Sequence, residues 1–498
     1  MNVNPITRLD YPDLDVIRVE DTYYMVSTTM HFMPGCEILQ SFDLVHWEHV
    51  TYVYETLDHT DAQQLKSGHN IYGQGMWAAS LRYHEGRFYI CFVANDTRKT
   101  YLYTSEKIDG PWKKQLIEGF YHDGSLLFDE DGRNYIVYGN DEIWITELNE
   151  DLTAPKKDGL HRLLVSDHKN PKLGYEGSHI QKINGYYYIF LVHSLRDRWM
   201  RTEACFYSDS LEGEFTGGDV LCDDRGYCGQ GVAQGGIVDT PDGKWYAMLF
   251  QDSGAVGRIP ILLPVTWKDH FPIFGQNGHV PEEIEVHSTR PGYIYQPLVG
   301  SDDFCNGLLP RWQFNHDPDP RYYHLDALQG TYTITTREVC TELTQAVNTL
   351  TQRMSYPSCA AEVTVDASAL KEGDVAGLCA LQGCYAAVGI TKHHGKYEVL
   401  MLDKKEDGIL DMTEGTVVES HQMDFRLEAD FCNMKDEARC YYRVNKGDWL
   451  PIGTVHKLYF KLDHFTGCRF GLFCYAAEET GGSACFRDFK YYDVDEIS

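Results

Sequence analysis

The chain has 498 residues and a mass of 57.1 kDa, a length that predicts two or three domains. Hydrophobic residues make up 43%, aromatic residues 13% and charged residues 24%, a globular composition that excludes disorder, collagen and coiled coil as the main state. The formal net charge of −30 repels phosphate backbones and anionic lipid headgroups, and no basic stretch in the sequence offsets it. We therefore expect a neutral partner, and neither nucleic acid nor a membrane surface.

The cysteines and the N-terminus bear on the compartment. The first residues lack the basic and apolar regions of a secretion signal, and no stretch approaches the roughly 18 apolar residues of a membrane span. The fifteen cysteines are scattered singly through apolar text such as Tyr89–Phe92 and Leu472–Tyr475. Buried free thiols in a reducing compartment explain this better than a disulfide framework. We expect a soluble, cytoplasmic protein, although removal of a leader would leave the same text.

One aromatic signature recurs five times in the first half of the chain. Its copies are Asp21–Tyr24, Gly86–Tyr89, Gly132–Tyr135, Gly185–Tyr188 and Gly243–Tyr246. Each copy predicts a turn that runs into a strand, because four open with glycine after an acidic or amide residue and continue with aromatic residues. The final tyrosines are separated by 65, 46, 53 and 58 residues, the spacing of four-stranded propeller blades. We predict an all-β chain with a five-bladed β-propeller over residues 1–298; a sandwich or other sheet arrangement is the alternative.

The residue pattern of the sequence changes after about residue 299. Polar and apolar residues alternate in segments such as Ala361–Val365 and Tyr441–Val444, and turns such as Asn445–Gly447 follow them. This pattern predicts a β-sandwich over residues 299–498. No linker rich in Pro, Gly or Ser separates the two halves, so we expect the domains to pack tightly. Association into a homo-oligomer is left open.

Five residues share one register relative to the repeated tyrosines. Twelve positions before four of the tyrosines stand Trp77, Asp123, Glu176 and Gln234, and eleven before Tyr24 stands Asp13. If the blades are equivalent, these residues lie on the innermost strands and converge on one central site. Carboxylates that face each other in a confined site raise one another's pKa, which suits general acid–base chemistry. Glycoside hydrolysis requires this division between a protonated acid and an ionised base.

Each of these residues also has an ordinary structural interpretation. An aspartate before a strand is usually a turn or cap residue, and Trp77 could belong to a core. The shared register is what favours a functional site. Other chemistries lack their motifs, because the sequence has no Gly-x-Ser-x-Gly elbow, P-loop, Rossmann glycine fingerprint or His-Glu-x-x-His zinc helix.

The segments around these positions resemble glycoside hydrolase family 43. They are Tyr11–Ile17, Gly75–Ser80, His122–Ser125, Tyr175–Gly177 and His287–Pro291. The resemblance implies that Asp13 is the general base, that Glu176 is the general acid, and that Asp123 orients the acid and tunes its pKa. The match is specific, because three acids occur in order and each lies within its own motif.

The resemblance also implies the residues that bind the sugar. Trp77 would supply an apolar wall, Arg290 would bind sugar hydroxyls, and Phe32 would stack on the sugar. The layout is similar to that of the family's β-xylosidases and α-L-arabinofuranosidases, whose sandwich extends a loop to the active site, and Phe465 is expected on that loop. Gln234 stands where many members have a histidine associated with a cation. We expect Gln234 at the substrate, no metal ligand and no required cofactor, with a structural calcium or sodium ion left open.

The expected function is that of an exo-acting, inverting glycoside hydrolase. It would release terminal α-L-arabinofuranosyl or β-D-xylosyl units from arabinoxylan or from neutral xylo-oligosaccharides. Inversion requires acid and base carboxyls about 6.5–9.5 Å apart, with room for a water. Two alternatives are a retaining fructosidase-like hydrolase, whose Arg-Asp-Pro segment is absent, and a carbohydrate-binding propeller without catalysis.

Overall fold

The computed structural model describes residues 3–493, so the outermost ends of the two predicted domains lie outside the described residues. Strands make up nearly all of its regular structure. The helices in this part of the chain are four short 3₁₀ turns: η1 (Lys66–Gly68), η2 (Gly254–Val256), η3 (Leu343–Gln345) and η4 (Cys432–Met434). None of the helices between residues 3 and 493 has the length and apolar character needed to cross a membrane.

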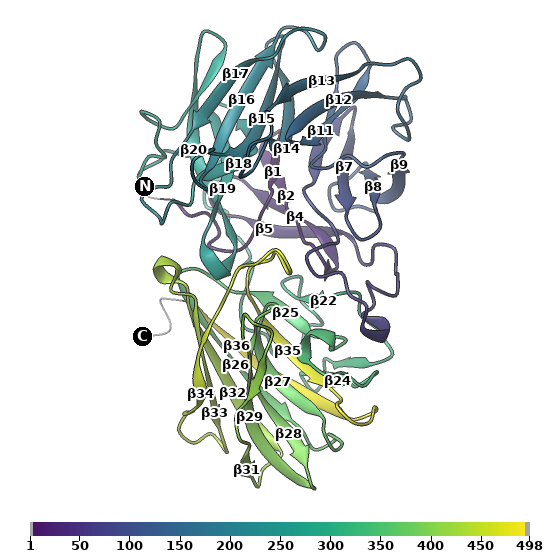
Figure 1. The fold of residues 1–498 in the computed structure, drawn as a ribbon, viewed down its shortest axis with the longest axis vertical. Coiled ribbons are helices and arrows are strands. Elements are labelled where there is room, and N and C mark those ends of the chain that lie inside the picture. The colour runs from purple at the N-terminus through teal and green to yellow at the C-terminus, as the bar shows by residue number, and fades with distance from the viewer. Residues whose placement is uncertain (1–2, 494–498) are drawn as a thin grey trace.

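Five antiparallel four-stranded sheets form the first domain (Figure 1). Blade 1 contains β1 (Asp15–Val19), β2 (Thr22–Val26), β4 (Gly35–Ser41) and β5 (Glu48–Tyr54). Blade 2 contains β6 (Ser80–His84), β7 (Arg87–Ala94), β8 (Lys99–Ser105) and β9 (Lys113–Ile117). Blade 3 contains β10 (Ser125–Phe128), β11 (Asn134–Asn140), β12 (Glu142–Leu148) and β13 (His161–Ser166). Blade 4 contains β14 (Glu176–Ile183), β15 (Tyr186–Ser194), β16 (Arg201–Ser208) and β17 (Thr216–Leu221). Blade 5 contains β18 (Val232–Asp239), β19 (Trp245–Asp252), β20 (Arg258–Lys268) and β21 (Phe271–Phe274).

The first strands of the blades surround a central axis. Strands β1, β6, β10, β14 and β18 contact one another in ring order, and the repeated tyrosines lie on the second strands, one step outward. The predicted five-bladed propeller is confirmed, and so is the placement of the repeats next to the innermost strands.

The N-terminal segment closes the ring. The Ile6 N–H donates to the Pro260 carbonyl at 2.9 Å, and the Tyr11 N–H donates to the Arg258 carbonyl at 3.0 Å, along the part of β20 that β21 leaves unpaired. These bonds join the residues just before β1 to blade 5. They also bring Asp13 next to the start of β20, which matters for the site described below.

Two antiparallel sheets form the second domain, the predicted β-sandwich. One has the order β3-β22-β25-β35-β27-β28-β29-β30, with β31 also on β29: β3 (Phe32–Met33), β22 (Gln313–Asn315), β25 (Leu350–Arg353), β35 (Arg469–Tyr475), β27 (Val375–Leu381), β28 (Ala386–His393), β29 (Lys396–Lys404), β30 (Leu410–Met412) and β31 (Thr416–Val418). The other has the order β23 (Tyr323–Asp326), β24 (Thr331–Thr335), β36 (Ser483–Asp493), β26 (Ser358–Asp366), β32 (Gln422–Asp430), β33 (Glu437–Arg443) and β34 (Leu450–Lys457). Apolar side chains from both sheets form one core between them.

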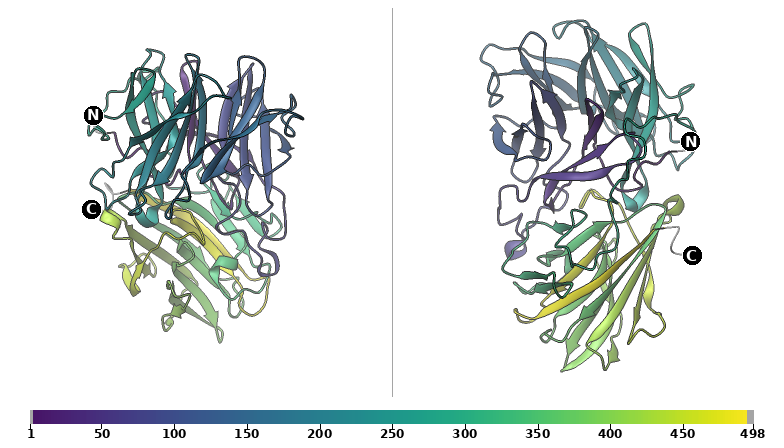
Figure 2. Two further views of the ribbon diagram at one scale, coloured as in Figure 1. Left: turned by 45° about the horizontal axis from the view of Figure 1, so that its top comes forward. Right: turned by 180° about the vertical axis from the view of Figure 1, so that it is seen from behind.

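The two domains pack directly against each other, as Figure 2 shows from two further directions. Strand β3 lies within blade 1 in sequence, yet it pairs with β22, so residues of the propeller half complete a sandwich sheet. Arg353 of the sandwich and Glu37 of blade 1 form a buried ion pair of 2.8 Å. A guanidinium and a carboxylate that are both buried stay compatible with folding only while they remain paired. The interface is therefore a structural part of both domains.

All fifteen cysteines are free, and ten of them are buried. Cys91 and Cys474, the two in the apolar segments singled out in the sequence, both lie within strands of the folded core. The expectation of free thiols is confirmed. They behave as small apolar side chains here.

Candidate active site

The residues of the shared register lie at one end of the central axis. Asp13 comes two residues before β1, Asp123 two residues before β10, and Glu176 is the first residue of β14. Trp77 comes three residues before β6, and Gln234 lies at the start of β18. All five innermost strands therefore present a register residue at their N-terminal ends, which we call the acidic end of the channel.

The carboxylate of Asp13 is held from two sides. The Thr28 hydroxyl donates to Oδ2 at 2.7 Å, and Nη1 of Arg258 donates to Oδ1 at 2.9 Å. Asp13 is 8% exposed, and its φ of +51° lies in the left-handed region that non-glycine residues seldom adopt. A carboxylate that a cation and a hydroxyl hold in one orientation is placed to accept a proton from a water molecule.

Glu176 and Asp123 form a pair of carboxyl groups that are connected through the backbone of Gly177. Nδ2 of Asn140 donates to Oε2 of Glu176 at 2.8 Å, and the N–H of Gly177 donates to Oδ2 of Asp123 at 2.9 Å. Burial raises the pKa of Asp123, and the charges of Glu176 and Asp13 add to this increase, against the opposing effect of His122. A proton is therefore retained in this pair at a pH where an isolated aspartate would have lost it.

His122 lies between these two carboxyls. Its Nε2 atom is 3.6 Å from Oδ2 of Asp123 and 3.7 Å from Oε2 of Glu176. The charge of Asp123, opposed by burial and assisted by Glu176, raises the pKa of His122 to about 9. The imidazole is therefore cationic at neutral pH. The sequence analysis assigned no role to His122. Its position directly before Asp123, in the same motif, could have indicated one.

Two aromatic residues form a wall beside the acids. The Trp77 ring lies 5.9 Å from the His122 ring and 5.6 Å from the Phe465 ring, centroid to centroid. Phe465 belongs to the loop of residues 458–468 that rises from the sandwich toward the propeller, drawn in yellow in Figure 1. The guanidinium of Arg258 stacks on the Phe465 ring at 4.2 Å. Trp77 and Phe465 therefore lie side by side at the acidic end, one from the propeller and one from the sandwich loop.

Gln234 lies on the other side of Glu176. A β-carbon at Gly177 would approach Cγ of Gln234 to 2.7 Å, so only glycine lets the two strands come this close. The Gln234 N–H donates to Oε2 of Glu203 at 2.7 Å. Burial raises the pKa of Glu203 well above its ordinary value, which favours the protonated form of this buried acid. The Gln234 side chain therefore lies next to the acids, where it contributes a neutral amide.

Two predicted sugar-binding residues lie elsewhere. Arg290 pairs with Asp21 at 2.8 Å and stacks on Phe42 at 4.1 Å. Asp21 is in the turn after β1, at the opposite end of that strand from Asp13, about 16 Å along a strand of five residues. The prediction for Arg290 is therefore corrected, and Arg258 is the arginine that meets the acids.

The expectation for Phe32 is also corrected. Phe32 is 1% exposed, lies in β3, and packs against the guanidinium of Arg469 at 3.5 Å. It belongs to a core cluster formed mainly by sandwich residues. A side chain enclosed in this way has no face for a sugar, so its role is to hold the two domains together.

A second arginine near the acids was not anticipated. Arg201 is buried at the start of β16, and Nε donates to Oδ2 of Asp252 at 2.9 Å. Burial lowers its pKa, but the charges of Asp252, Glu176 and Asp13 outweigh that effect and raise it. Arg201 and Arg258 both stand on strands outside the innermost ring, where the tyrosine register carries no signal.

The acidic end does not supply an obvious cation site. His122, Asp123 and Glu176 are the only group of three or more His, Cys, Asp or Glu residues between residues 3 and 493 whose ligand atoms all lie within 4.8 Å of one another. A cationic imidazole has no free lone pair for a metal. Gln234, next to this group, offers only a neutral amide, which is a weak substitute for a carboxylate ligand. These residues do not fit a calcium or sodium ion well.

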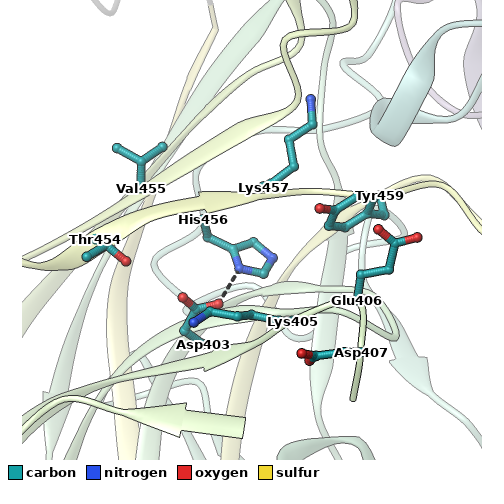
Figure 3. Close-up of a pocket in the computed structure, with 9 residues that line it drawn as sticks. All are labelled: Asp403, Lys405, Glu406, Asp407, Thr454, Val455, His456, Lys457 and Tyr459. Carbon is teal, nitrogen blue, oxygen red and sulfur yellow. Dashed lines mark hydrogen bonds and ion pairs between the residues drawn. The ribbon is translucent and has the colours of Figure 1, made fainter. Parts of the chain in front are cut away.

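Figure 3 shows a separate cavity of about 550 Å³ on the sandwich, between β29 and β34. Its central contact is a 2.7 Å bond between Nδ1 of His456 and Oδ1 of Asp403. None of the register residues lines it. The bond joins two strands, and the cavity lacks the converging carboxyls of the acidic end.

Comparison with known proteins agrees with this geometry. Residues 3–272 match the family model of glycosyl hydrolases family 43, and residues 301–492 match the β-xylosidase C-terminal concanavalin A-like domain. The chain belongs to glycosyl hydrolase family 43. It is a glycoside hydrolase, and the resemblance noted in the sequence is confirmed.

Individual relatives agree with the family assignment. A β-xylosidase of Formosa agariphila is 27% identical, with 99% of this chain and 89% of that protein aligned. A xylosidase/arabinosidase of Humicola insolens is 25% identical, with 98% and 96% aligned. The solved structure of a bifunctional GH43-CE protein of Bacteroides eggerthii is 42% identical with a TM-score of 0.92; it aligns with 99% of this chain, which spans 64% of that longer protein.

Proposed function

We propose that this family 43 chain is an exo-acting, inverting hydrolase that removes single terminal pentosyl units, α-L-arabinofuranosyl or β-D-xylosyl, from xylan-type oligosaccharides. The observation that carries the proposal is the arrangement of three carboxyls at one end of the channel, with Asp13 bound to Arg258 and Glu176 joined to Asp123 through Gly177. The names of the relatives, which include β-xylosidase and xylosidase/arabinosidase, support a pentose as the sugar released.

In the proposed reaction Glu176 protonates the departing glycosidic oxygen while Asp13 takes a proton from the attacking water. The bond from the anomeric carbon to the leaving oxygen breaks as the bond to water forms on the opposite face, so the configuration inverts. Asp123 keeps a proton available to Glu176 and holds the start of β14 in place. The reaction uses only carboxyls and water, and we propose that it needs no cofactor.

The Phe465 loop supports the exo mode of action. Phe465 and Trp77 form one wall next to the acids, and the loop is fixed to the propeller because Oδ2 of Asp10 accepts the Gly467 N–H at 2.8 Å. A pocket closed by a loop from the second domain accommodates the end of a chain more readily than its middle. This geometry favours removal of terminal units.

The decisive experiment compares substrates with two kinds of leaving group, nitrophenolate and a sugar. Wild type, Glu176→Gln and Asp13→Asn are assayed on nitrophenyl β-D-xylopyranoside and α-L-arabinofuranoside, and on xylobiose. Removal of either group should lower the rate about 10²–10⁴-fold on xylobiose. Nitrophenolate leaves without a proton, so Glu176→Gln should lose much less on the nitrophenyl substrates, whereas Asp13→Asn should lose equally on both.

Controls and product analysis complete the test. Glu130, an exposed carboxylate in blade 3, provides Glu130→Gln as a variant that should retain full activity. Proton NMR of the first product from a β-xyloside should show the α-anomer. A first product with the β-anomer would reject inversion, and an inert wild type on all substrates would reject the pentosidase proposal in favour of carbohydrate binding without catalysis.

A further inference from the structure

Two loops next to Glu176 form a rim at the acidic end. One is residues 167–175, which lead into β14, and the other is residues 195–200, which join β15 to β16. Because β14 begins with Glu176 and pairs with the end of β15, both loops emerge at the same end of blade 4 as the general acid. We call these two loops the blade-4 rim.

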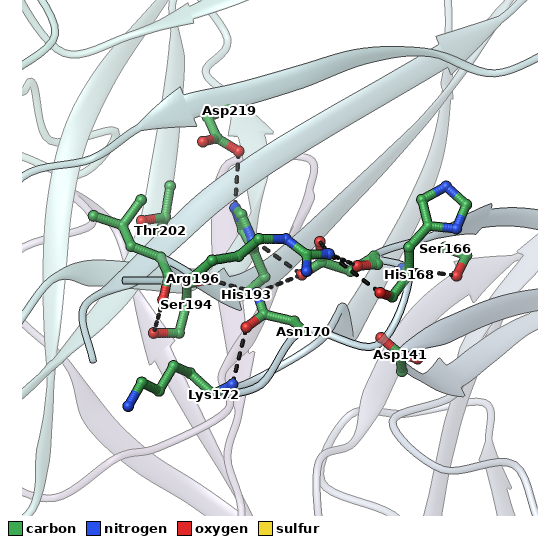
Figure 4. Close-up of polar contacts among 12 residues, drawn as sticks. Asp141, Ser166, His168, Asn170, Lys172, His193, Ser194, Arg196, Thr202 and Asp219 are labelled. Atoms are coloured by element: carbon green, nitrogen blue, oxygen red, sulfur yellow. Dashed lines mark hydrogen bonds and ion pairs between the residues drawn. The ribbon is translucent and has the colours of Figure 1, made fainter. Parts of the chain in front are cut away.

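The rim is a built structure rather than two independent loops, as Figure 4 shows. Nδ2 of Asn170 donates to the Ser194 carbonyl at 2.7 Å, and the Ser194 N–H donates to the Leu173 carbonyl at 3.0 Å. Arg196 extends across to the first loop and donates to the backbone carbonyl of Asp167. The backbones of the two loops are therefore held together.

Trp199 is the main apolar group on this rim. Its side chain is 46% exposed, in contrast to Trp47 and Trp312, which are buried. The guanidinium of Arg201 lies 5.4 Å from the Trp199 ring, and the charges of Glu176 and Asp13 act on that guanidinium. Trp199 thus lies beside the Arg201 guanidinium and is exposed to solvent at the same end of blade 4 as Glu176. An exposed indole face is a common platform for a sugar ring.

The same rim gathers positive charge in a strongly acidic protein. It carries four lysine and arginine residues, Lys169, Lys172, Arg196 and Arg198, against the two aspartates at 167 and 197. Arg196 is bonded to Asp167 and Arg198 to Asp197, while the ammonium groups of both lysines form no ion pair between residues 3 and 493. The Asp141 carboxylate also faces the loop; both of its oxygens accept the backbone N–H of Lys169, and it adds one negative charge beside the two lysines. The sequence analysis found no basic stretch because these charges come from two separate loops.

We propose that the blade-4 rim binds the part of the substrate beyond the scissile bond, and that it selects a saccharide chain carrying a carboxylate, such as a uronic acid substituent. Trp199 supports one sugar ring, and Lys169 and Lys172 meet the carboxylate. The inference rests on the proposed function for the position of the scissile bond, and it changes the expected substrate from a neutral chain to one with an acidic branch.

A binding experiment tests the rim without requiring turnover. The full chain with Glu176→Gln is titrated calorimetrically with xylotriose bearing one glucuronosyl group, and with the same compound after reduction of its carboxyl to an alcohol. The acidic ligand should bind about three- to fivefold tighter than the reduced one. In about 0.5 M salt this preference should disappear, because both lysines are exposed to solvent.

Variants assign the effect to individual side chains. Trp199→Ala should weaken both ligands up to about tenfold, while Trp199→Phe, which keeps an aromatic face, should retain most of the affinity. Lys169→Gln with Lys172→Gln should remove only the preference for the acidic ligand. Tyr83→Ala and Lys268→Gln are matched controls, because Tyr83 lines the opposite mouth of the channel and Lys268 ends β20 at the far side from Arg258.

The outcomes separate this inference from the proposed function. Equal affinity of Trp199→Ala and its parent for both ligands would overturn the inference. Loss of affinity in Trp199→Ala without any preference for the acidic ligand would overturn the assigned ligand class. Turnover of nitrophenyl pentosides by the wild type is measured alongside, so an inert wild type that still shows the expected binding pattern would reject the pentosidase reaction and support the rim.

Discussion

Nη1 of Arg258 donates a 2.9 Å hydrogen bond to Oδ1 of Asp13, and both side chains are buried. The same guanidinium stacks on the Phe465 ring at 4.2 Å. One arginine of blade 5 therefore connects the carboxylate before blade 1 with the loop of the sandwich. Arg258 therefore helps to fix both the proposed general base, together with Thr28, and the aromatic wall beside it.

Replacement of Arg258 should lower the catalytic rate by more than a loss of folded protein would explain. Arg258→Met leaves Asp13 buried without its cation, and we expect kcat/KM on xylobiose to fall about 10²-fold or more. Arg258→Lys keeps the charge but not the planar fork that bonds and stacks at once, so its loss should be intermediate. Steady-state kinetics provide the measurement. Arg18→Met, at the other end of the channel beside Asp239, is the control that should retain activity, and equal losses in both variants would contradict the assignment.

The pH dependence of kcat/KM should depend on the cationic His122, which lies between Asp123 and Glu176. The charge of Asp123 raises the pKa of His122 to about 9, and the cationic His122 in turn lowers the pKa of Asp123 against the effect of burial. His122→Asn removes that charge, so Asp123, which we propose keeps a proton available to the general acid, should hold its own proton to higher pH. The alkaline limb of kcat/KM should then shift upward by about one unit. A profile of His122→Asn that overlays the wild type would show that the imidazole has no such influence.

The Phe465 wall gives a prediction that concerns the second domain. Phe465 contacts Trp77 and Arg258 at the pocket, while Leu462 on the same loop is 76% exposed. Phe465→Ala should lower kcat/KM about tenfold through a higher KM, because an aromatic face against the sugar is lost. Leu462→Ala, which alters the same loop without reaching the pocket, should match the wild type. Similar losses in the two variants would indicate a general disturbance of the loop.

The sequence was informative where the fold repeats and uninformative where it does not. Asp13, Trp77, Asp123, Glu176 and Gln234 could be found because equivalent strands place equivalent positions around one axis. Their convergence follows from the blade period alone, before any contact is known.

Residues outside that period needed the three-dimensional structure. Arg258 stands on the third strand of blade 5, 245 positions from Asp13, and it meets the acid only because the N-terminal segment runs along β20. Phe32 leaves its blade to pair with a strand almost 300 residues later, a tertiary choice that local pattern does not encode. Arg290 was assigned from a short motif, whereas the turn at Asp21 holds it at the wrong end of the channel.

The ion pair between Arg82 and Asp15 should determine how the stability of the propeller changes at acidic pH. Arg82 donates to Oδ2 of Asp15 at 2.7 Å and also bonds the backbone of blades 3 and 4, so it ties the innermost strands together. Burial would raise the pKa of Asp15, but Arg82 and His179 lower it from 3.8 to about 2.

Because the folded pKa of Asp15 is depressed, its contribution to stability is complete above about pH 4 and is lost as the pH falls through about 2. The difference corresponds to about 2 kcal/mol of unfolding free energy. Asp15→Asn should cost about 2–3 kcal/mol at neutral pH, since the partly buried Arg82 loses the Asp15 carboxylate and keeps only neutral oxygens as acceptors, and it should flatten the acid limb of the stability curve. Urea unfolding between pH 2 and 7 measures both effects. Asp21→Asn breaks the exposed pair with Arg290 instead and should change stability by less than about 1 kcal/mol, so equal losses in the two variants would contradict the special role of the buried pair.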